Sequence, residues 1–259
     1  MVRMVVHAGF HKTGTSTIQK VLRQNKKLLQ PHARIVLKTG IGSLCDATRL
    51  WSRRREAFER RGVEIELKLF LDSLNPKAGR TICISAEDLA GHLPGRKEVE
   101  GYDATAQLME MFREAVHKAP FKVNDLTFFF TTRSPKSWLQ SSYVQHVRGA
   151  RMVMDFDDYA AQFKQAAELN AVVCDVAQAV EPSSVQSSAL EDTMHLPFGP
   201  ATPLLDLLHV PEQTRAEMKT TQPVNPAPSQ QLLAELLRLN RSDLSDSEVK
   251  QAKLDLLQG

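Results

Sequence analysis

Short, mainly apolar runs alternate along the chain with longer stretches in which apolar residues recur every three or four positions. The short runs predict strands at four places: Met4–Ala8, Thr81–Ser85, Leu126–Thr131 and, with a weaker pattern, Ala171–Cys174. Phe128, Phe129 and Phe130 are consecutive, which is typical of a strand buried on both faces of a parallel sheet. The run Ala33–Lys38 is a candidate for a further short strand.

The longer stretches have the periodicity of amphipathic helices. They predict helices at Thr17–Leu29, Arg53–Leu74, Ala104–Lys118, Lys136–Val147 and Asp157–Leu169. Strands that alternate with helices indicate an α/β protein. We therefore expect a P-loop-like, three-layer fold whose central sheet is mostly parallel and flanked by helices. Such a sheet binds ligands at the carboxyl ends of its strands.

The last third of the chain has a different pattern. Eight prolines fall between residues 182 and 228, so we expect the segment 176–228 to form loops and short helices draped over the sheet. Two helices are predicted beyond it, Ser229–Asn240 and Ser245–Leu257, and the second begins with a Ser-x-x-Glu capping box. We interpret residues 1–259 as one domain in which residues 176–259 form a loop-rich and helical part.

The first candidate binding motif follows the first predicted strand. The sequence reads His11-Lys12-Thr13-Gly14-Thr15-Ser16-Thr17 and leads into a helix. A strand, a glycine-containing loop and a helix can bind phosphate, because backbone N–H groups and the helix N-terminus face the anion. The nucleotide triphosphatase motif has its lysine directly after the second glycine, whereas here the lysine lies inside the loop. A tight structural turn with an exposed lysine is the alternative interpretation.

The second candidate motif follows the strand Leu126–Thr131. Arg133 lies at the expected carboxyl edge of the sheet, where a guanidinium can bind a phosphate in bidentate fashion. Pro135 is suited to the first turn of a helix, with Ser134 as its N-cap. Ser141 then follows Arg133 by eight residues, two helical turns into that helix.

The two motifs together resemble the sulfotransferases that depend on 3′-phosphoadenosine-5′-phosphosulfate (PAPS), in particular the bacterial carbohydrate-type enzymes. Lys12 to Ser16 are similar to that family's 5′-phosphosulfate loop, and Arg133 and Ser141 match its 3′-phosphate segment. The resemblance implies transfer of a sulfuryl group from PAPS, without a metal, to a hydroxyl or amine acceptor that is a small molecule or a carbohydrate. It also implies that residues 11–17 bind PAPS and that Lys12 neutralises charge on the transferring group.

Glu87 is the first candidate for the base that accepts the acceptor's proton. It follows the strand Thr81–Ser85, in a segment that resembles the Ser-Ser-Glu stretch of the bacterial relatives. The alternative is that Glu87 and Asp88 only complement the dipole of a helix that they begin. His11 and His92 are further candidates for the base.

A third contact to the nucleotide is expected near the C-terminus. The segment Lys219–Ser229 resembles the Asn-x-Ser stretch that precedes the last helices of the bacterial relatives. It lacks the arginine expected there, and Lys219 is the candidate replacement.

Composition and charge restrict the partners. A formal charge of +3 suits an anionic ligand but is too small to predict nucleic-acid binding. Five arginines between residues 53 and 61 form either a solvated helix face or a surface that collects an acidic acceptor. The odd number of cysteines, Cys45, Cys83 and Cys174, predicts reduced structural thiols. No apolar run reaches the length of a membrane span, and we expect a cytoplasmic protein.

Two other functions remain open on the sequence. A P-loop kinase of a small metabolite would require Mg²⁺, but Thr132 and Arg133 follow the strand at which an acidic residue would be expected. A non-catalytic nucleotide-binding protein of the same fold is the second alternative.

Overall fold

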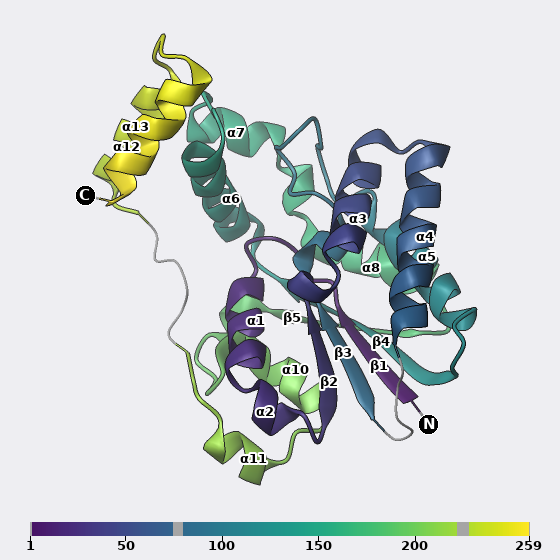
Figure 1. The fold of residues 1–259 in the computed structure, drawn as a ribbon. Helices are drawn as coiled ribbons and strands as arrows, with labels where there is room; N and C mark the ends of the chain where they lie inside the picture. The colour runs from purple at the N-terminus through teal and green to yellow at the C-terminus, as the bar shows by residue number, and fades with distance from the viewer. Residues whose placement is uncertain (1, 75–79, 222–227, 259) are drawn as a thin grey trace.

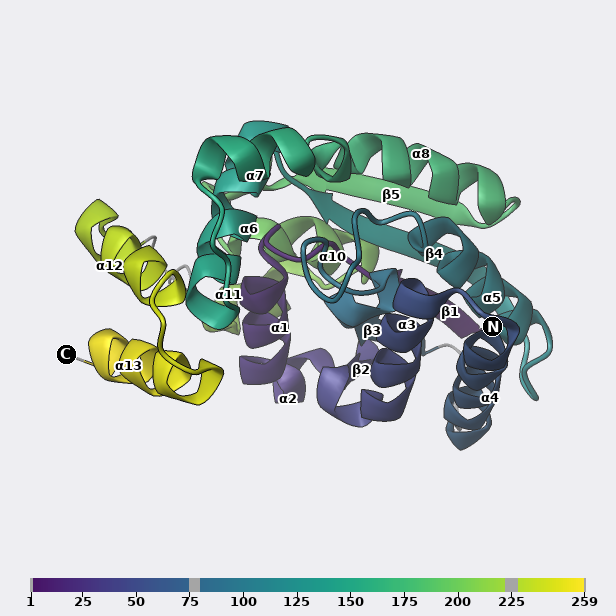
Figure 2. The ribbon, with the colours of Figure 1, turned by 90° about the horizontal axis from the view of Figure 1, so that it is seen from above.

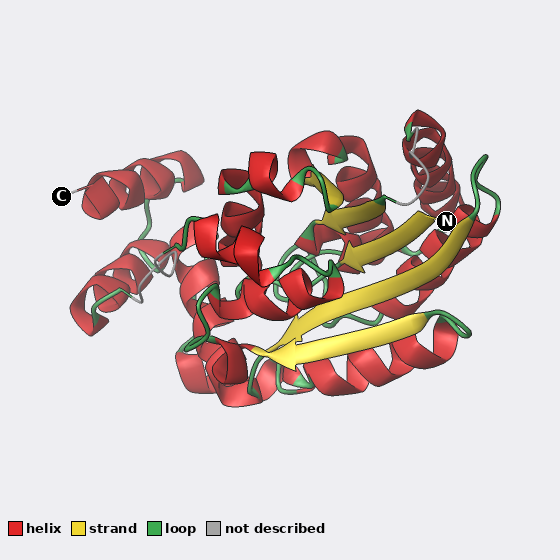
Figure 3. Cartoon of the chain, turned by 90° about the horizontal axis from the view of Figure 1, so that it is seen from below, coloured by secondary structure: helices red, strands yellow, loops and turns green. Residues whose placement is uncertain are grey.

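A central sheet organises the protein, which is described here by a computed structural model that covers residues 2–74, 80–221 and 228–258. In those residues the sheet has five parallel strands in the spatial order β2-β3-β1-β4-β5, and their arrows all point the same way (Figure 3). The strands are β1 Val2–His7, β2 Ala33–Leu37, β3 Thr81–Ser85, β4 Val123–Thr132 and β5 Ser184–Ala189.

Helices cover both faces of the sheet (Figures 1 and 2). The helices that pack on one face are α3 Gly42–Arg54, α4 Ala57–Ser73, α5 Thr105–His117, α6 Pro135–Gly149 and α8 Leu169–Ala179. Those on the other face are α1 Thr15–Gln24, α2 Lys26–Leu29 and α10 Thr202–Leu207. The prediction of a three-layer α/β fold with a parallel central sheet is confirmed.

Short helices and a C-terminal hairpin complete the described chain. The shorter elements are η1 Lys38–Gly40, η2 Glu87–Ala90, α7 Phe156–Gln162, η3 Gln165–Ala167, α9 Leu190–Thr193, η4 Gly199–Ala201 and α11 Glu212–Glu217. The hairpin consists of α12 Gln230–Asn240 and α13 Asp246–Gln258, and it packs beside α6 (Figure 1). Lys253 of α13 donates to the carbonyls of Val147 and Ala150 at the end of α6.

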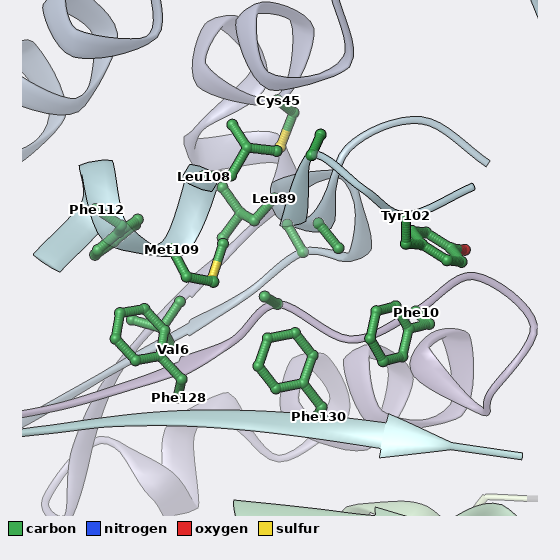
Figure 4. Packing of buried hydrophobic residues seen from close by; sticks show 14 of the residues in the cluster. Val6, Phe10, Cys45, Leu89, Tyr102, Leu108, Met109, Phe112, Phe128 and Phe130 are labelled. Carbon is green, nitrogen blue, oxygen red and sulfur yellow. The ribbon is translucent and has the colours of Figure 1, made fainter. Parts of the chain in front are cut away.

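The middle strands are apolar because both of their faces are buried. Phe128 and Phe130 of β4 pack against Phe112 and Met109 of α5 on one face of the sheet (Figure 4), whereas Phe129 packs on the opposite face. The alternation follows from the period of two along a strand. The unbroken phenylalanine run therefore belongs to a doubly covered strand, as its sequence predicts.

The point at which ligands are expected lies between β1 and β4. These two strands are neighbours in the sheet, but the helices that follow them leave on opposite faces: Ile18 of α1 packs in one core and Trp138 of α6 in the other. In open α/β sheets such a switch in direction opens a crevice beyond the carboxyl ends of the strands. Both candidate motifs border this crevice.

Two strand predictions need correction. Ala171–Cys174 is not a strand but the middle of α8, whose buried residues Leu169 and Val176 have helical spacing. The missing strand is β5, which falls within the segment predicted to hold only loops and short helices. Its sequence, Ser-Val-Gln-Ser-Ser-Ala, is polar because it forms the edge of the sheet and is mostly exposed, so it lacks the apolar pattern of the inner strands.

Three of the predicted helices are shorter or interrupted. The helix expected at Thr17–Leu29 breaks at Asn25, whose side chain bonds the carbonyls of Val21 and Lys219. The one expected at Arg53–Leu74 is two helices, because Arg55 has a left-handed backbone conformation (φ 58°) that ends α3. The one expected at Asp157–Leu169 ends at Gln162 and continues as the short η3.

The other helix predictions hold to within two residues at each end. Ser245 begins α13 with the expected capping box: the Glu248 carboxylate accepts from the Ser245 N–H at 2.8 Å. All three cysteines are free thiols. Cys45 and Cys83 are buried in the core, whereas Cys174 is exposed on α8.

Two fully buried histidines make the stability of this fold depend on pH. Burial lowers the pKa of His7 to about 3 and that of His146 to about 4, from the ordinary value near 6.5. The unfolded chain therefore binds more protons than the folded one below pH 6.5. Stability is complete above that pH and is lost as the pH falls toward 4. The free energy of unfolding should fall by at most about 1.4 kcal/mol per pH unit for each histidine.

Urea titrations between pH 7 and 5 measure this slope. His146→Gln should reduce it, whereas His117→Gln, which changes an exposed histidine on α5, should leave it unchanged. If the free energy of unfolding does not change between pH 7 and 5, the two histidines do not have the lowered pKa values given above.

Candidate functional site

The loop between β1 and α1 has backbone dihedral angles that residues other than glycine rarely adopt. Gly9, Lys12 and Gly14 all have positive φ, at 44°, 69° and 95°. A Cβ atom on Gly14 would lie 2.9 Å from Leu190 Cδ1 and from Pro200 Cγ. Glycine is thus required at position 14 by both conformation and space. Gly14 is also the N-cap of α1, so the helix N-terminus opens directly onto the loop.

One contact within the loop and two contacts to β4 and α6 hold it in place. The Thr13 hydroxyl, which is fully buried, donates to the Phe10 carbonyl at 2.6 Å and lies 2.7 Å from the Thr131 hydroxyl. Trp138 Nε1 donates to the His11 carbonyl at 2.9 Å. These bonds fix the two loop residues on either side of Lys12. Thr13 therefore has a structural role and does not face the crevice.

Arg133 joins the two motifs. Its Nη1 donates to the Lys12 carbonyl at 3.1 Å, and its Nε donates to the Ser137 hydroxyl at 3.1 Å. Burial lowers the pKa of the Arg133 guanidinium, and the nearby Glu191 carboxylate partly opposes this shift. Glu191 itself accepts from the Ser134 N–H at 3.1 Å, so Ser134 begins α6 without capping it through its own side chain.

Lys12 lies between cations. Its ammonium donates to the Gln145 side-chain carbonyl at 3.3 Å, a neutral partner. Burial, followed by the charges of Arg133, Arg148 and Arg96, lowers the pKa of Lys12. An anion bound beside this half-buried ammonium would stabilise its charged form.

Ser141 lies on the face of α6 that borders the loop. Ser137 and Gln145 are four residues before and after it, and they contact Arg133 and Lys12 respectively. Residues four apart lie on the same helix face, so Ser141 lies between the two cations along α6. The prediction that Ser141 shares a site with Arg133 is consistent with this placement.

The hydroxyls at the start of α1 differ in exposure. Thr15 is buried and Ser16 is exposed, and both line the cleft described below. Thr17 does not line it; its N–H donates to the Gly14 carbonyl at 3.0 Å.

Glu87 and Asp88 follow β3 and have different environments. Glu87 borders the cleft, where one carboxylate oxygen accepts from Gln19 Nε2 at 2.5 Å. Asp88 is buried and bonds Lys38, Arg49 (3.0 Å) and His11 (3.4 Å). Burial alone would raise the pKa of Asp88, but the hydrogen bonds from His11 and Lys38 outweigh it and hold the pKa well below its usual range.

The helix that Glu87 and Asp88 were alternatively expected to begin is only the four-residue η2, which ends at Ala90. Ser85, the last residue of β3, is fully buried, and its hydroxyl lies 2.8 Å from His7 Nδ1.

The two histidine candidates for the base also differ. Both ring nitrogens of His11 have partners: Nδ1 lies 3.2 Å from the Tyr102 hydroxyl and Nε2 contacts Asp88. His92 Nδ1 has no hydrogen-bond partner among the described residues. Burial and the charges of His11, Arg49 and other nearby cations lower the pKa of His92 to about 4, so it is neutral at pH 7.

Some of these side chains line a cleft of about 450 Å³, but Arg133 and Ser141 are not among its lining residues. Its lining combines the loop between β1 and α1 with residues that follow β2 and β3: His11, Lys12, Thr15, Ser16, Lys38, Arg49, Glu87, Asp88, His92, Leu93, Arg96, Lys97 and Gln145. The sequence-predicted residues Lys12 and Glu87 therefore lie in the same cleft. The described residues of the segment Lys219–Ser229, which are 219–221 and 228–229, do not line it, and residues 222–227 lie outside the described residues.

Several residues of the cleft have no signal in the sequence motifs. Asp88 was noted only beside Glu87, yet it holds His11, Lys38 and Arg49 together. Gln145, the partner of Lys12, could have been found from its position four residues after Ser141 on the predicted helix. Arg96 lies in a loop and has no such regular spacing.

Comparison with known proteins gives one informative likeness. The crystal structure of a sulfotransferase from Alicyclobacillus acidocaldarius matches the whole chain over 94% of its own length, with a TM-score of 0.51 and 16% sequence identity. No family model matches the chain, and no curated protein matches its sequence. At this identity the likeness shows that the two proteins share a fold.

Two further observations concern other classes of site. Across the described ranges, no helix combines the length and the apolar character needed to cross a membrane. The same ranges contain no group of three His, Cys, Asp or Glu side chains placed to hold a metal ion.

Asp88 should be essential to the structure of the cleft. Asp88→Asn would leave Lys38 and Arg49 without their buried anion and should lower the free energy of unfolding by about 1–3 kcal/mol, since both cations are partly solvated. The control is Asp46→Asn, because Asp46 also pairs with Arg49 but is exposed. Chemical denaturation at pH 7 measures both variants. Equal small effects would show that the buried position of Asp88 does not matter.

Proposed function

We propose that this protein is a sulfotransferase that uses PAPS as its sulfuryl donor. The observation that carries the proposal is the contact between Arg133 and the Lys12 carbonyl, which unites two motifs 121 residues apart at one crevice. A phosphosulfate and a separate 3′-phosphate require two cationic positions, and Lys12 and Arg133 provide them. The fold shared with a bacterial sulfotransferase agrees with this function.

The residues of the crevice fit the nucleotide. Gly14 leaves no side chain between the loop and Leu190, and the N-terminus of α1 adds positive potential at the same point. The Lys12 ammonium has only a neutral partner, so a bound phosphosulfate would supply the missing negative charge. Arg133, with Ser141 one turn beyond Ser137, would bind the 3′-phosphate.

When bound, PAPS would supply a sulfuryl group activated by its anhydride bond to the 5′-phosphate. In transfer, the acceptor oxygen or nitrogen bonds to sulfur, and the bond from sulfur to the 5′-phosphate oxygen breaks. The nucleotide then leaves as 3′-phosphoadenosine-5′-phosphate (PAP). Lys12 would neutralise the charge that develops on the departing phosphate oxygen. Because this charge is largest as the bond breaks, Lys12 is expected to contribute more to turnover than to binding.

We assign the base to Glu87. It lies in the cleft with Lys12, and Gln19 orients one of its carboxylate oxygens, which leaves the other for the acceptor's proton. His11 is a poorer candidate because Tyr102 and Asp88 occupy both of its ring nitrogens. His92 is the second candidate, since one of its nitrogens has no partner among the described residues.

Substitutions of Arg133 and Lys12 should affect nucleotide binding and turnover of PAPS to different degrees. Arg133→Ala should weaken PAP binding by about 1.5–3 kcal/mol, the contribution of a hydrogen bond to a charged group. Lys12→Ala should depress the rate of PAP formation from PAPS more than it weakens PAP binding. Lys136→Ala is the control, because Lys136 is an exposed cation in the first turn of α6. Calorimetry would measure PAP affinity, and unchanged affinity in Arg133→Ala would refute the 3′-phosphate assignment.

Glu87→Gln tests the base. The amide keeps the size of the side chain but cannot take a proton, so kcat should fall by about 100-fold or more while PAP binding is retained. PAP release from PAPS with a panel of hydroxyl and amine acceptors measures the rate, with Glu98→Gln, an exposed glutamate, as the control. If Glu87→Gln keeps its activity and His92→Gln loses it, the base is His92.

A further inference from the structure

The cleft holds more positive charge than its own carboxylates balance. Its lining has five lysines and arginines, namely Lys12, Lys38, Arg49, Arg96 and Lys97, and two carboxylates, Glu87 and Asp88. Lys38 and Arg49 both pair with Asp88. Lys12 would be neutralised by the nucleotide under the proposed function. Arg96 and Lys97, which lie in the segment between η2 and α5, are the lysine and arginine residues of the lining that then remain.

Arg96 is the unusual member of this set. Its Nε is buried and has no hydrogen-bond partner among the described residues, and the side chain as a whole is partly buried. Burial alone lowers the pKa of its guanidinium, and no carboxylate opposes the shift. Lys12, which lies near enough for Arg96 to lower its pKa, adds repulsion. A partly buried arginine without an anion is costly, and a bound anion would remove that cost.

The position of Arg96 is fixed by the loop that carries it. The Gly95 N–H donates to the Val99 carbonyl at 2.7 Å, and the Val99 N–H donates back to the Arg96 carbonyl at 3.1 Å. His146 of α6 donates through Nε2 to the Pro94 carbonyl at 2.8 Å. The turn is thus closed on itself and attached to the helix that also supplies Gln145. Because these bonds hold the backbone on both sides of Arg96, the loop loses little freedom when a ligand binds to the side chain.

The cationic residues of the cleft are distinct from the five arginines between residues 53 and 61. Those arginines surround the junction of α3 and α4, are exposed, and are in part paired: Arg54 with Glu59, and Arg60 and Arg61 with Glu64. They do not line the cleft. The residues able to bind an acidic ligand are therefore the ones beside Glu87.

Building on the proposed function, we propose that the acceptor is an anion. Its hydroxyl or amine would lie at Glu87, and a carboxylate, sulfate or phosphate elsewhere on the same molecule would bind Arg96, with Lys97 at the exposed rim. The volume of the cleft is within the range of small-molecule sites, so the bound part of the acceptor has the size of one or two sugar rings or of a phenol.

The test measures binding to the complex with PAP, so that it does not depend on turnover. Calorimetric titrations would compare neutral and anionic probes of the same size: methyl glucoside against methyl glucuronide and glucose 6-phosphate, and tyrosol against 4-hydroxyphenylacetate. We expect at least about tenfold tighter binding of an anionic probe than of its neutral counterpart. The carboxylate and phosphate probes show which anionic group the site prefers.

Arg96→Gln should remove that preference and leave the affinity for PAP unchanged within about twofold. Arg113→Gln is the matched control, because Arg113 also has a buried Nε without a partner among the described residues but lines a cavity at the amino ends of β4 and β5. It should behave as the wild type. The preference should also weaken as ionic strength rises.

Failure of this inference can be told from failure of the proposed function. If the wild type does not bind PAP, the proposed function is wrong and the inference falls with it. If PAP binds but no anionic probe binds better than its neutral counterpart, or if the preference survives in Arg96→Gln, only the inference is overturned. A large loss of PAP affinity in Arg96→Gln would also overturn it, because Arg96 would then belong to the nucleotide site.

Discussion

The site depends on the parallel pairing of β1 with β4. Because the strands are parallel and in register up to His7 and Phe129, their carboxyl ends meet at one edge of the sheet. The loop that follows β1 is then joined to the end of β4 by the Thr13 and Thr131 hydroxyls at 2.7 Å, and to the residue after β4 by Arg133, which donates to the Lys12 carbonyl at 3.1 Å. A shift of one residue in this register would separate both contacts.

Charge is distributed unevenly around this junction. On the side of β2 and β3, Asp88 neutralises Lys38 and Arg49 and keeps the cleft wall in place. Lys12 and Arg96 have no such partner among the described residues, and each is partly buried. Lys12 and Arg96 are therefore the cations that the proposed anionic ligands would neutralise, whereas Asp88 pairs with cations of the protein itself. Two adjacent carboxylates, Glu87 and Asp88, thus differ in their surroundings.

Much of the fold could be predicted because the inner strands are buried on both faces. The run Phe128 to Phe130 has one interpretation, a strand covered on both sides, and the structure agrees. The edge strand β5 could not be recognised, since most of its residues are polar and none of them is fully buried. Ala171–Cys174 was misread because four apolar residues fit a strand and a helix equally well, and only the contacts of Leu169 and Val176 decide between them.

The site could be predicted in part for a similar reason. Lys12, Arg133 and Ser141 follow strands or have helical spacing, so local sequence places them at the edge of the sheet. Asp88 is significant only because elements distant in sequence bring His11, Lys38 and Arg49 to it. Contacts of this kind depend on tertiary packing and leave no periodic pattern.

The most direct test of the central claim is whether the protein recognises a 3′-phosphate. Calorimetry would compare PAP with AMP, which lacks only that phosphate, and with ATP, each with and without Mg²⁺. PAP should bind at least about tenfold tighter than AMP, and Mg²⁺ should not change the affinity for PAP. Equal affinities for PAP and AMP, or a preference for ATP with Mg²⁺, would rule out a site for the 3′-phosphate.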